Sequence, residues 1–248
     1  MSDNKFPSEV IDLPSEGKLY PKDSPLSEGK VEIKYMTAKE EDILTSQNLI
    51  KKGVVIDRLL DSLILTNGVT TDDMILGDKN AIMVAARILA YGPEYECKVT
   101  NPNSGETINH TFNLADCPFK KLPKGITENL FEITLPISKK KIKFNLLTGK
   151  EERLIETDLK ASKKLNSVSP ELTTRLRYLI KEVDGDNNQS VINSFSQNML
   201  ARDSMHLRKI MRDATPDIDL SQEIDLGGET VKVNIPMTVN FFWPDAAG

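Results

Sequence analysis

Residues 78–100, DKNAIMVAARILAYGPEYECKVT, decide the fold class of this 248-residue chain. The apolar side chains of residues 81–91 are spaced for a helix. Gly92 and Pro93 then form a stop signal, because glycine supplies a left-handed residue and proline prevents continuation. Directly afterwards, apolar and charged residues alternate over 94–99 with the period of a half-buried strand. This stretch predicts an α+β protein in which helical groups are combined with small antiparallel β-hairpins.

Upstream of this stretch, the pattern predicts a strand followed by helices. Residues 30–36 alternate between apolar and polar side chains. Thr37 and Glu40 then form a capping box, in which each side chain satisfies a free backbone amide at the start of a helix. Residues 54–65 place apolar side chains on one side and charged ones on the other. We therefore predict a strand plus a helical group over residues 30–92.

Downstream, residues 93–147 predict a module of β-hairpins. Apolar residues alternate on both sides of a turn-forming segment, 101–105, and the same pattern recurs on both sides of residues 136–138. The predicted strands are residues 95–99, 108–112, 130–135 and 141–146.

Residues 148–248 predict a second helical group that ends in strands and an aromatic terminus. Thr148 and Glu151 form another capping box, and Pro170 occupies a first-turn position where its missing amide costs nothing. The predicted helices are residues 148–165, 169–183, 190–200 and 203–212. Alternation over 231–235 then predicts a strand.

The first 29 residues are rich in proline and glycine, which break helices, and are predicted to form an extended arm. We expect the whole chain to form one or two compact domains. If the arm serves only a partner, its removal should leave the rest of the fold intact.

Composition narrows the functional classes. Lys and Arg number 32 against 37 Asp and Glu, so the net charge of −5 gives no general attraction for phosphates. Two cysteines are too few for a disulfide framework and indicate a reducing compartment. No apolar stretch reaches the roughly 20 residues that a membrane span needs. We expect a protein without a secretion signal or membrane span that stays in the cytoplasm where it is made.

The segment 101–105, NPNSG, has the shape of a zinc knuckle but lacks its ligands. Asn101 and Ser104 stand where such a turn carries cysteines, and an amide and a hydroxyl do not hold zinc. Cys97 and Cys117 lie too far apart in sequence to replace them. The sequence therefore predicts a zinc-ribbon-like hairpin without metal, and no cofactor.

The sequence favours no enzymatic activity. It contains no nucleophile elbow and no glycine-rich phosphate loop. A hydrolase would need two carboxylates paired in a cleft, and the acidic residues are scattered along predicted helix surfaces. We expect no catalytic residues and no small-molecule substrate.

Residues 138–143, SKKKIK, form a basic cluster with two interpretations. Lysines on a hairpin edge discourage edge-to-edge pairing. A phosphate-binding patch on Lys139–Lys143 would instead make the protein a nucleic-acid-binding regulator, which the mean charge and the lack of adjacent aromatic residues disfavour.

Two apolar groups are candidates for partner binding. The first lies in the arm and the second at the C-terminus, where aromatic side chains must be covered either by the protein's own sheet or by a partner. The candidate residues are Leu13, Leu19, Tyr20, Phe241, Phe242 and Trp243.

Several segments together resemble the baseplate hub proteins of T-even-like contractile-tailed bacteriophages. They follow one another in the family's order and span most of the chain. The segments are residues 13–20 (LPSEGKLY), 31–44 (VEIKYMTAKEEDIL), 49–60 (LIKKGVVIDRLL), the turn 101–105, 203–208 (DSMHLR) and 241–245 (FFWPD).

The resemblance implies a non-enzymatic protein of tail morphogenesis that acts in assembly of the central baseplate hub through contacts with other hub subunits. Two roles are open: a structural subunit carried in the virion, or a hub assembly catalyst or chaperone that leaves. The family often carries a cysteine pair at the knuckle, where this chain has Asn101 and Ser104. The expected location is the host cytoplasm during assembly, and the virion baseplate for a structural subunit.

Overall fold

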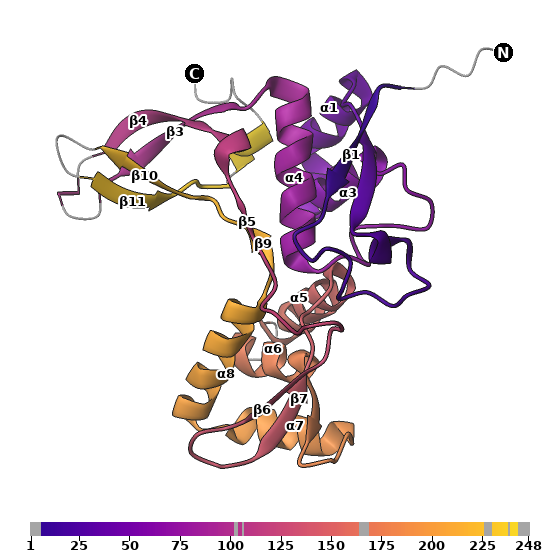
Figure 1. Ribbon diagram of the computed structural model, residues 1–248, viewed down its shortest axis with the longest axis vertical. Coiled ribbons are helices and arrows are strands. Elements are labelled where there is room, and N and C mark those ends of the chain that lie inside the picture. The colour runs from indigo at the N-terminus through magenta and orange to yellow at the C-terminus, as the bar shows by residue number, and fades with distance from the viewer. Residues whose placement is uncertain are drawn as a thin grey trace.

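The computed structural model describes residues 6–101, 104–105, 107–163, 169–225, 230–237 and 239–242. Figure 1 shows two bodies, one above the other, joined by a narrow crossing. The first body contains the described residues within 6–117 and 220–242, and the second contains those within 122–214. Each body has its own cluster of buried apolar side chains.

The first body begins with an antiparallel pair of strands and a group of four α-helices. Apolar faces of the helices pack around Leu59, Leu60 and Leu63. The elements are β1 (Ser8–Asp12), the 3-10 helix η1 (Pro25–Glu28), β2 (Lys30–Lys34), α1 (Ala38–Thr45), α2 (Gln47–Lys52), α3 (Val55–Leu63) and α4 (Leu76–Tyr91).

The N-terminal arm is an integral part of this body. Strand β1 pairs with β2 from Ser8 opposite Lys34 to Asp12 opposite Lys30, and Leu13 and Leu26 are buried in the core. This packing leads us to expect that removal of the arm would expose β2 and open the core, instead of leaving the fold intact.

Two hairpins complete the first body. In Figure 1 they project to one side of α4 and lie close to each other. They are β3 (Glu94–Thr100) with β4 (Thr107–Asn113), and β10 (Ser221–Asp225) with β11 (Thr230–Asn234). The 3-10 helices η2 (Leu114–Asp116) and η3 (Val239–Phe242) follow β4 and β11.

The second body is a three-stranded antiparallel sheet with four helices. The strand order is β6–β7–β8, and Leu135, Phe144, Leu179 and Leu207 are among its buried residues. The elements are β6 (Phe131–Thr134), β7 (Lys141–Phe144), α5 (Gly149–Lys163), α6 (Glu171–Leu179), β8 (Ile180–Val183), α7 (Gln189–Asn198) and α8 (Ala201–Ala214).

Residues 180–183 differ from the sequence prediction, which extended a helix to Val183. The helix ends at Leu179 because Ile180 adopts an extended conformation, with φ −75° and ψ 130°. Strand β8 then pairs with β7, with Val183 opposite Ile142. Ile180 and Val183 are buried, so the sheet provides the partner that a continued helix would lack.

The chain passes between the bodies twice, through β5 (Phe119–Lys120) and β9 (Asp217–Ile218), which pair antiparallel. Figure 1 shows this crossing beside the lower end of α4. A Cβ atom built on Gly77 would overlap the carbonyl oxygen of Pro216, so only glycine allows α4 to approach this close.

The described residues contain eight α-helices and five small antiparallel sheets of two or three strands, which confirms the predicted α+β class. Among these helices, none combines the length and apolar character needed to cross a membrane.

Candidate interaction surfaces

The arm residues Leu13, Leu19 and Tyr20 lie inside the chain's own fold. Leu13 is buried in the core of the first body and Leu19 in that of the second. Tyr20 is half-buried; its hydroxyl donates to Asp78 at 2.6 Å and accepts from the amide of Ile75 at 3.1 Å. The three candidate partner-binding residues of the arm are therefore covered by this chain.

Asp78, in the first turn of α4, fastens the arm to the helix. Its carboxylate is fully buried and accepts from the amide of Ser15 at 2.9 Å and from its hydroxyl at 2.5 Å, besides the bond from Tyr20. Burial raises the pKa of Asp78 although these donors oppose the rise. Burial, followed by the nearby charge of Asp78, raises the pKa of Tyr20. These polar groups satisfy one another, which lets the arm lie against the core without unpaired groups.

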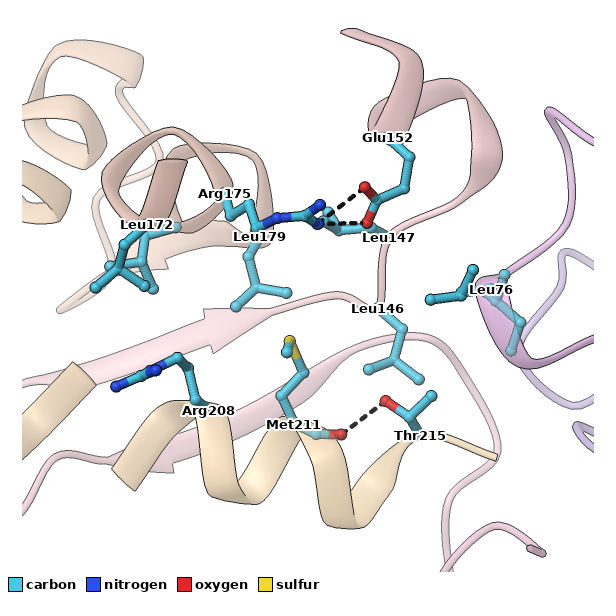
Figure 2. Close-up of a pocket in the computed structure, with 12 residues that line it drawn as sticks. Leu76, Leu146, Leu147, Glu152, Leu172, Arg175, Leu179, Arg208, Met211 and Thr215 are labelled. Atoms are coloured by element: carbon cyan, nitrogen blue, oxygen red, sulfur yellow. Dashed lines mark hydrogen bonds and ion pairs between the residues drawn. The ribbon is translucent and has the colours of Figure 1, made fainter. Parts of the chain in front are cut away.

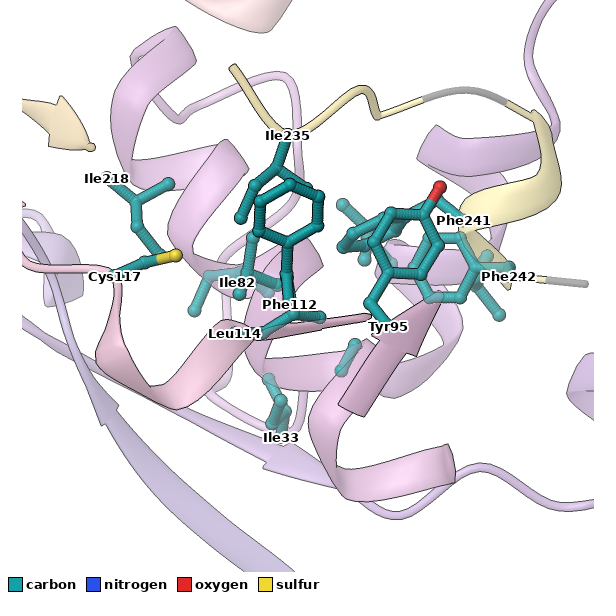
Figure 3. Close-up of a cluster of buried hydrophobic side chains, with 14 of the residues drawn as sticks. Ile33, Ile82, Tyr95, Phe112, Leu114, Cys117, Ile218, Ile235, Phe241 and Phe242 are labelled. Carbon is teal, nitrogen blue, oxygen red and sulfur yellow. The ribbon is translucent and has the colours of Figure 1, made fainter. Parts of the chain in front are cut away.

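The aromatic end of the chain is also covered from within. Phe241 and Phe242 are each about 1% exposed. In Figure 3 both lie beside Tyr95, whose ring meets that of Phe241 edge-on at 5.2 Å between centroids. The carbonyl oxygen of Phe241 accepts from Nε of Arg87 at 2.8 Å. Trp243, the third candidate residue of this group, lies outside the described residues.

Arg87 is a buried cation bound mainly by carbonyl oxygens. Its other guanidinium nitrogens donate to Gly92 at 3.0 Å and to Glu94 at 3.2 Å. The rings of Tyr91 and Tyr95 also face the guanidinium, at 5.1 and 5.8 Å. Burial lowers the pKa of Arg87. This one side chain therefore joins the end of α4, the start of β3 and the C-terminal η3.

The knuckle-like turn is closed by its own asparagine. Asn101 is buried; its side-chain oxygen accepts from the amide of Ser104 at 3.3 Å, and its carbonyl accepts from the amide of Gly105 at 2.8 Å. Burial raises the pKa of both thiols, Cys97 and Cys117. Across the part of the chain that is described, no group of three or more His, Cys, Asp or Glu residues is placed to hold a metal ion.

Two of the four lysines of 139–143 form ion pairs with acidic side chains. Lys140 lies 2.6 Å from Asp184, and Lys143 lies 2.9 Å from Glu182 on the neighbouring strand β8. These ion pairs lower the charge that the cluster presents to solution. The arrangement fits the edge of a solvated sheet better than a phosphate-binding patch.

An apolar groove in the second body, continued by the start of α4, is the surface that the sequence did not reveal. It has a cavity volume of about 180 Å³. Figure 2 shows one wall formed by α8 and the opposite wall by α6, with Leu146 and Leu76 towards one end. The apolar lining residues are Ile75, Leu76, Leu146, Leu147, Leu172, Leu176, Leu179 and Met211.

The mouth of the groove leaves apolar surface in contact with water. Leu76 is 48% exposed and Leu172 is 42% exposed. Arg175 is held in the α6 wall by Glu152, with its Nη1 2.7 and 2.9 Å from the two carboxylate oxygens. Arg208, on the α8 wall, is exposed, and its Nε lies 3.4 Å from the carbonyl oxygen of Ser204.

Sequence patterns do not reveal this groove because its walls come from four separate stretches of the chain. The only local signal is the spacing of Leu172, Leu176 and Leu179, which marks one apolar face of a helix but not what that face meets. The gap between α6 and α8 is a property of tertiary packing.

Of the comparisons with known proteins, one identifies a family for this chain. Neither the curated proteins nor the solved structures gave a match to this chain. The sequence profile described as T4 bacteriophage base plate protein matches residues 7–133. This match covers just over half of the chain, from β1 through η2 and β5 to β6. The chain therefore belongs to the T4 bacteriophage base plate protein family.

Proposed function

We propose that the protein acts, without enzymatic activity, in assembly of the central hub of the phage baseplate through contacts with other hub subunits. The observation that carries this proposal is the family match over residues 7–133. A baseplate protein works by binding its neighbours, and the groove between α6 and α8 offers apolar surface for such contacts.

Assignment to the hub, as opposed to another part of the baseplate, is supported by the segments that resemble hub proteins and follow one another in the same order as in that family. Those segments include residues beyond the family match, at 203–208 and 241–245. In the structure, Asp203 accepts from the amides of Ile137 and Ser138 at 2.8 and 3.0 Å, so the first of these segments fixes the β6–β7 turn.

A nucleic-acid-binding role finds less support. Lys140 and Lys143 already pair with carboxylates, and phosphate binding would have to displace those partners. Such a role predicts nucleic-acid affinity that falls steeply with salt, because each phosphate contact releases a counterion. Filter binding at low and moderate salt tests this directly.

Quantitative mass spectrometry of finished phage particles and of assembling baseplates from infected cells tests the proposed role. Stoichiometric peptides in finished particles identify a structural subunit of the virion. Peptides confined to assembly intermediates in the host cytoplasm identify a hub assembly catalyst or chaperone.

Cross-linking of the same intermediates tests the hub assignment. We expect cross-links from this chain to hub subunits. Cross-links confined to proteins of the baseplate wedges would refute the hub role and leave the family assignment standing.

A further inference from the structure

We propose that the groove between α6 and α8 binds an acidic amphipathic segment of another baseplate protein, with one large apolar side chain in the cavity and a carboxylate paired with Arg208. The inference rests on the proposed function, which it deepens by naming the docking surface and the chemistry of the partner.

The size of the cavity sets the apolar part of the partner. A volume of about 180 Å³ accommodates one large side chain such as leucine, methionine or phenylalanine. The exposed faces of Leu76 and Leu172 stand at the mouth, where they would be covered by the residues on either side of that side chain. Central apolar residues of this kind dominate the energetics of protein interfaces.

The shape of the groove favours a segment of chain that follows α8. Arg208 and Met211 line the groove three residues apart on one face of α8, and Thr215, directly after the end of the helix, continues this row. Figure 2 shows these three side chains in a row below Leu172 and Leu179. A segment lying between α6 and α8 would contact both walls along this row.

Charge sets the polar part of the partner. The chain as a whole carries −5, but α8 contains four basic residues, Arg202, Arg208, Lys209 and Arg212, against two acidic ones. Both acids are engaged: Asp203 accepts from two backbone amides, and Asp213 lies 3.7 Å from Arg212. Among the described residues, no carboxylate lies within ion-pair distance of Arg208. Of the four basic residues of α8 only Arg208 lines the groove, so this wall offers one positive charge that is complementary to a carboxylate of an acidic partner.

The test is selection of short random peptides, displayed on an unrelated scaffold, against the full-length protein. We expect enriched peptides to share a large apolar residue with an Asp or Glu nearby. Fluorescence polarisation with the enriched peptides then compares variants of the protein. Leu76→Glu and Leu172→Glu should each weaken binding by about tenfold or more, because each places a charge at the apolar mouth.

Leu154→Glu is the matched control. Leu154 lies on α5, outside the groove lining, and is 43% exposed, close to the exposure of Leu172. It should leave the affinity within about twofold of the wild type, while circular dichroism verifies that all three variants fold.

Arg208→Glu tests the ion pair separately. This substitution should weaken the binding of acidic peptides about fivefold. Binding to the variant should be restored when the acidic residue of the peptide is replaced by lysine. Failure to enrich any peptide, equal binding by Leu172→Glu and the wild type, or absence of this rescue would each overturn the proposal.

Self-association is the remaining alternative. If light scattering shows that the wild type is a dimer and Leu172→Glu is a monomer, the groove binds a second copy and the proposed partner is wrong. If the Leu172→Glu variant no longer binds peptide but still enters hub intermediates normally, the groove does not serve assembly and this proposal is wrong. If the wild-type protein forms no cross-links to hub subunits, the proposed function itself is wrong.

Discussion

Glu40 carries a negative charge inside the first body, where its side chain has no exposed surface. Lys34 donates to it at 2.8 Å, and the amide and hydroxyl of Thr37 donate at 3.0 and 2.6 Å. Burial alone would raise the pKa of Glu40, but these hydrogen bonds outweigh burial and lower it to about 2. Folding therefore favours the charged form.

The pH dependence of stability follows from this shift. The contribution of Glu40 is fully present above its ordinary pKa of 4.5 and is lost as the pH falls towards about 2. At neutral pH, Glu40→Gln should lower the free energy of unfolding by about 3 kcal/mol, the size of the shift converted to energy. Urea unfolding at neutral pH and near pH 2 measures the free energy of unfolding of the wild type and of the variant. The difference between the two proteins should be much smaller near pH 2 than at neutral pH.

Glu41→Gln is the control for this experiment, because Glu41 is exposed on the same helix. It should change stability by less than about 0.5 kcal/mol at either pH. If Glu40→Gln lowers the free energy of unfolding by the same amount at both pH values, the charge of the Glu40 carboxylate contributes nothing to stability.

At this scale, local partners can be predicted from sequence and distant ones cannot. Thr37 and Glu40 are three residues apart, and their capping box is confirmed. The carbonyl acceptors of Arg87 come from Gly92 and Glu94, where α4 ends and β3 begins, and from Phe241, 154 residues away. No pattern around Arg87 indicates that set, because tertiary folding alone brings it together.

At the scale of elements, Gly77 decides how closely α4 approaches the crossing. Alanine is normally the better helix residue, by roughly 0.5–1 kcal/mol. Here its Cβ would overlap the backbone of Pro216, which belongs to the segment entering β9. Gly77→Ala should therefore destabilise the protein, by about 1–3 kcal/mol, as overpacking does. Urea unfolding gives the magnitude, and hydrogen exchange should show faster opening of β9.

The control is the reverse exchange, Ala90→Gly, near the other end of α4. It should cost about 0.5–1 kcal/mol through helix propensity alone and leave exchange in β9 unchanged. If Gly77→Ala stabilises the protein as propensity predicts, α4 and β9 do not approach as closely as the structure places them.

Helix and strand boundaries can be predicted where a local sequence signal marks them. The stop at Gly92 and Pro93 is confirmed: α4 ends at Tyr91 and β3 begins at Glu94. The pattern over 169–183 predicts one helix because the apolar residues Ile180 and Val183 suit a buried helix face and a buried strand equally well. Only pairing with β7 makes them a strand.

At the scale of the whole molecule, the two cores are connected at several points. Leu19 of the arm is buried in the second core, and Tyr20 packs against both. The amides of Gly149 and Lys150 donate to the carbonyls of Met74 and Asp72, each at 2.9 Å. We expect calorimetry to show a single unfolding transition with equal calorimetric and van't Hoff enthalpies.

Removal of residues 1–20 should lower the stability of both bodies together. Hydrogen exchange should accelerate in β6–β8 as well as in β2, whereas Val10→Ser, at a position 60% exposed on β1, should change neither. Two separate transitions, or an unaffected second body, would show that the bodies are energetically independent.

The groove marks the limit of sequence reasoning at this scale. Its composition, mainly leucine with arginine, is ordinary for amphipathic helices. The candidate residues Leu13, Phe241 and Phe242 drew attention because they are apolar near the chain ends, yet the structure places them in the first core. Which apolar side chains remain uncovered depends on the packing of the bodies.

During synthesis, the last residue of the second core is translated before the last residue of the first core. The last element of the second core, α8, ends at Ala214, whereas the first core still awaits Ile224, Val231 and Phe242. At about 5–20 residues per second, roughly 6–25 s separate translation of residue 117 from that of residue 242. During that interval Tyr95 and Phe112 lack their later partners. On the ribosome, the molecule is therefore completed from its middle outward, and its N-terminal half is the last part to close.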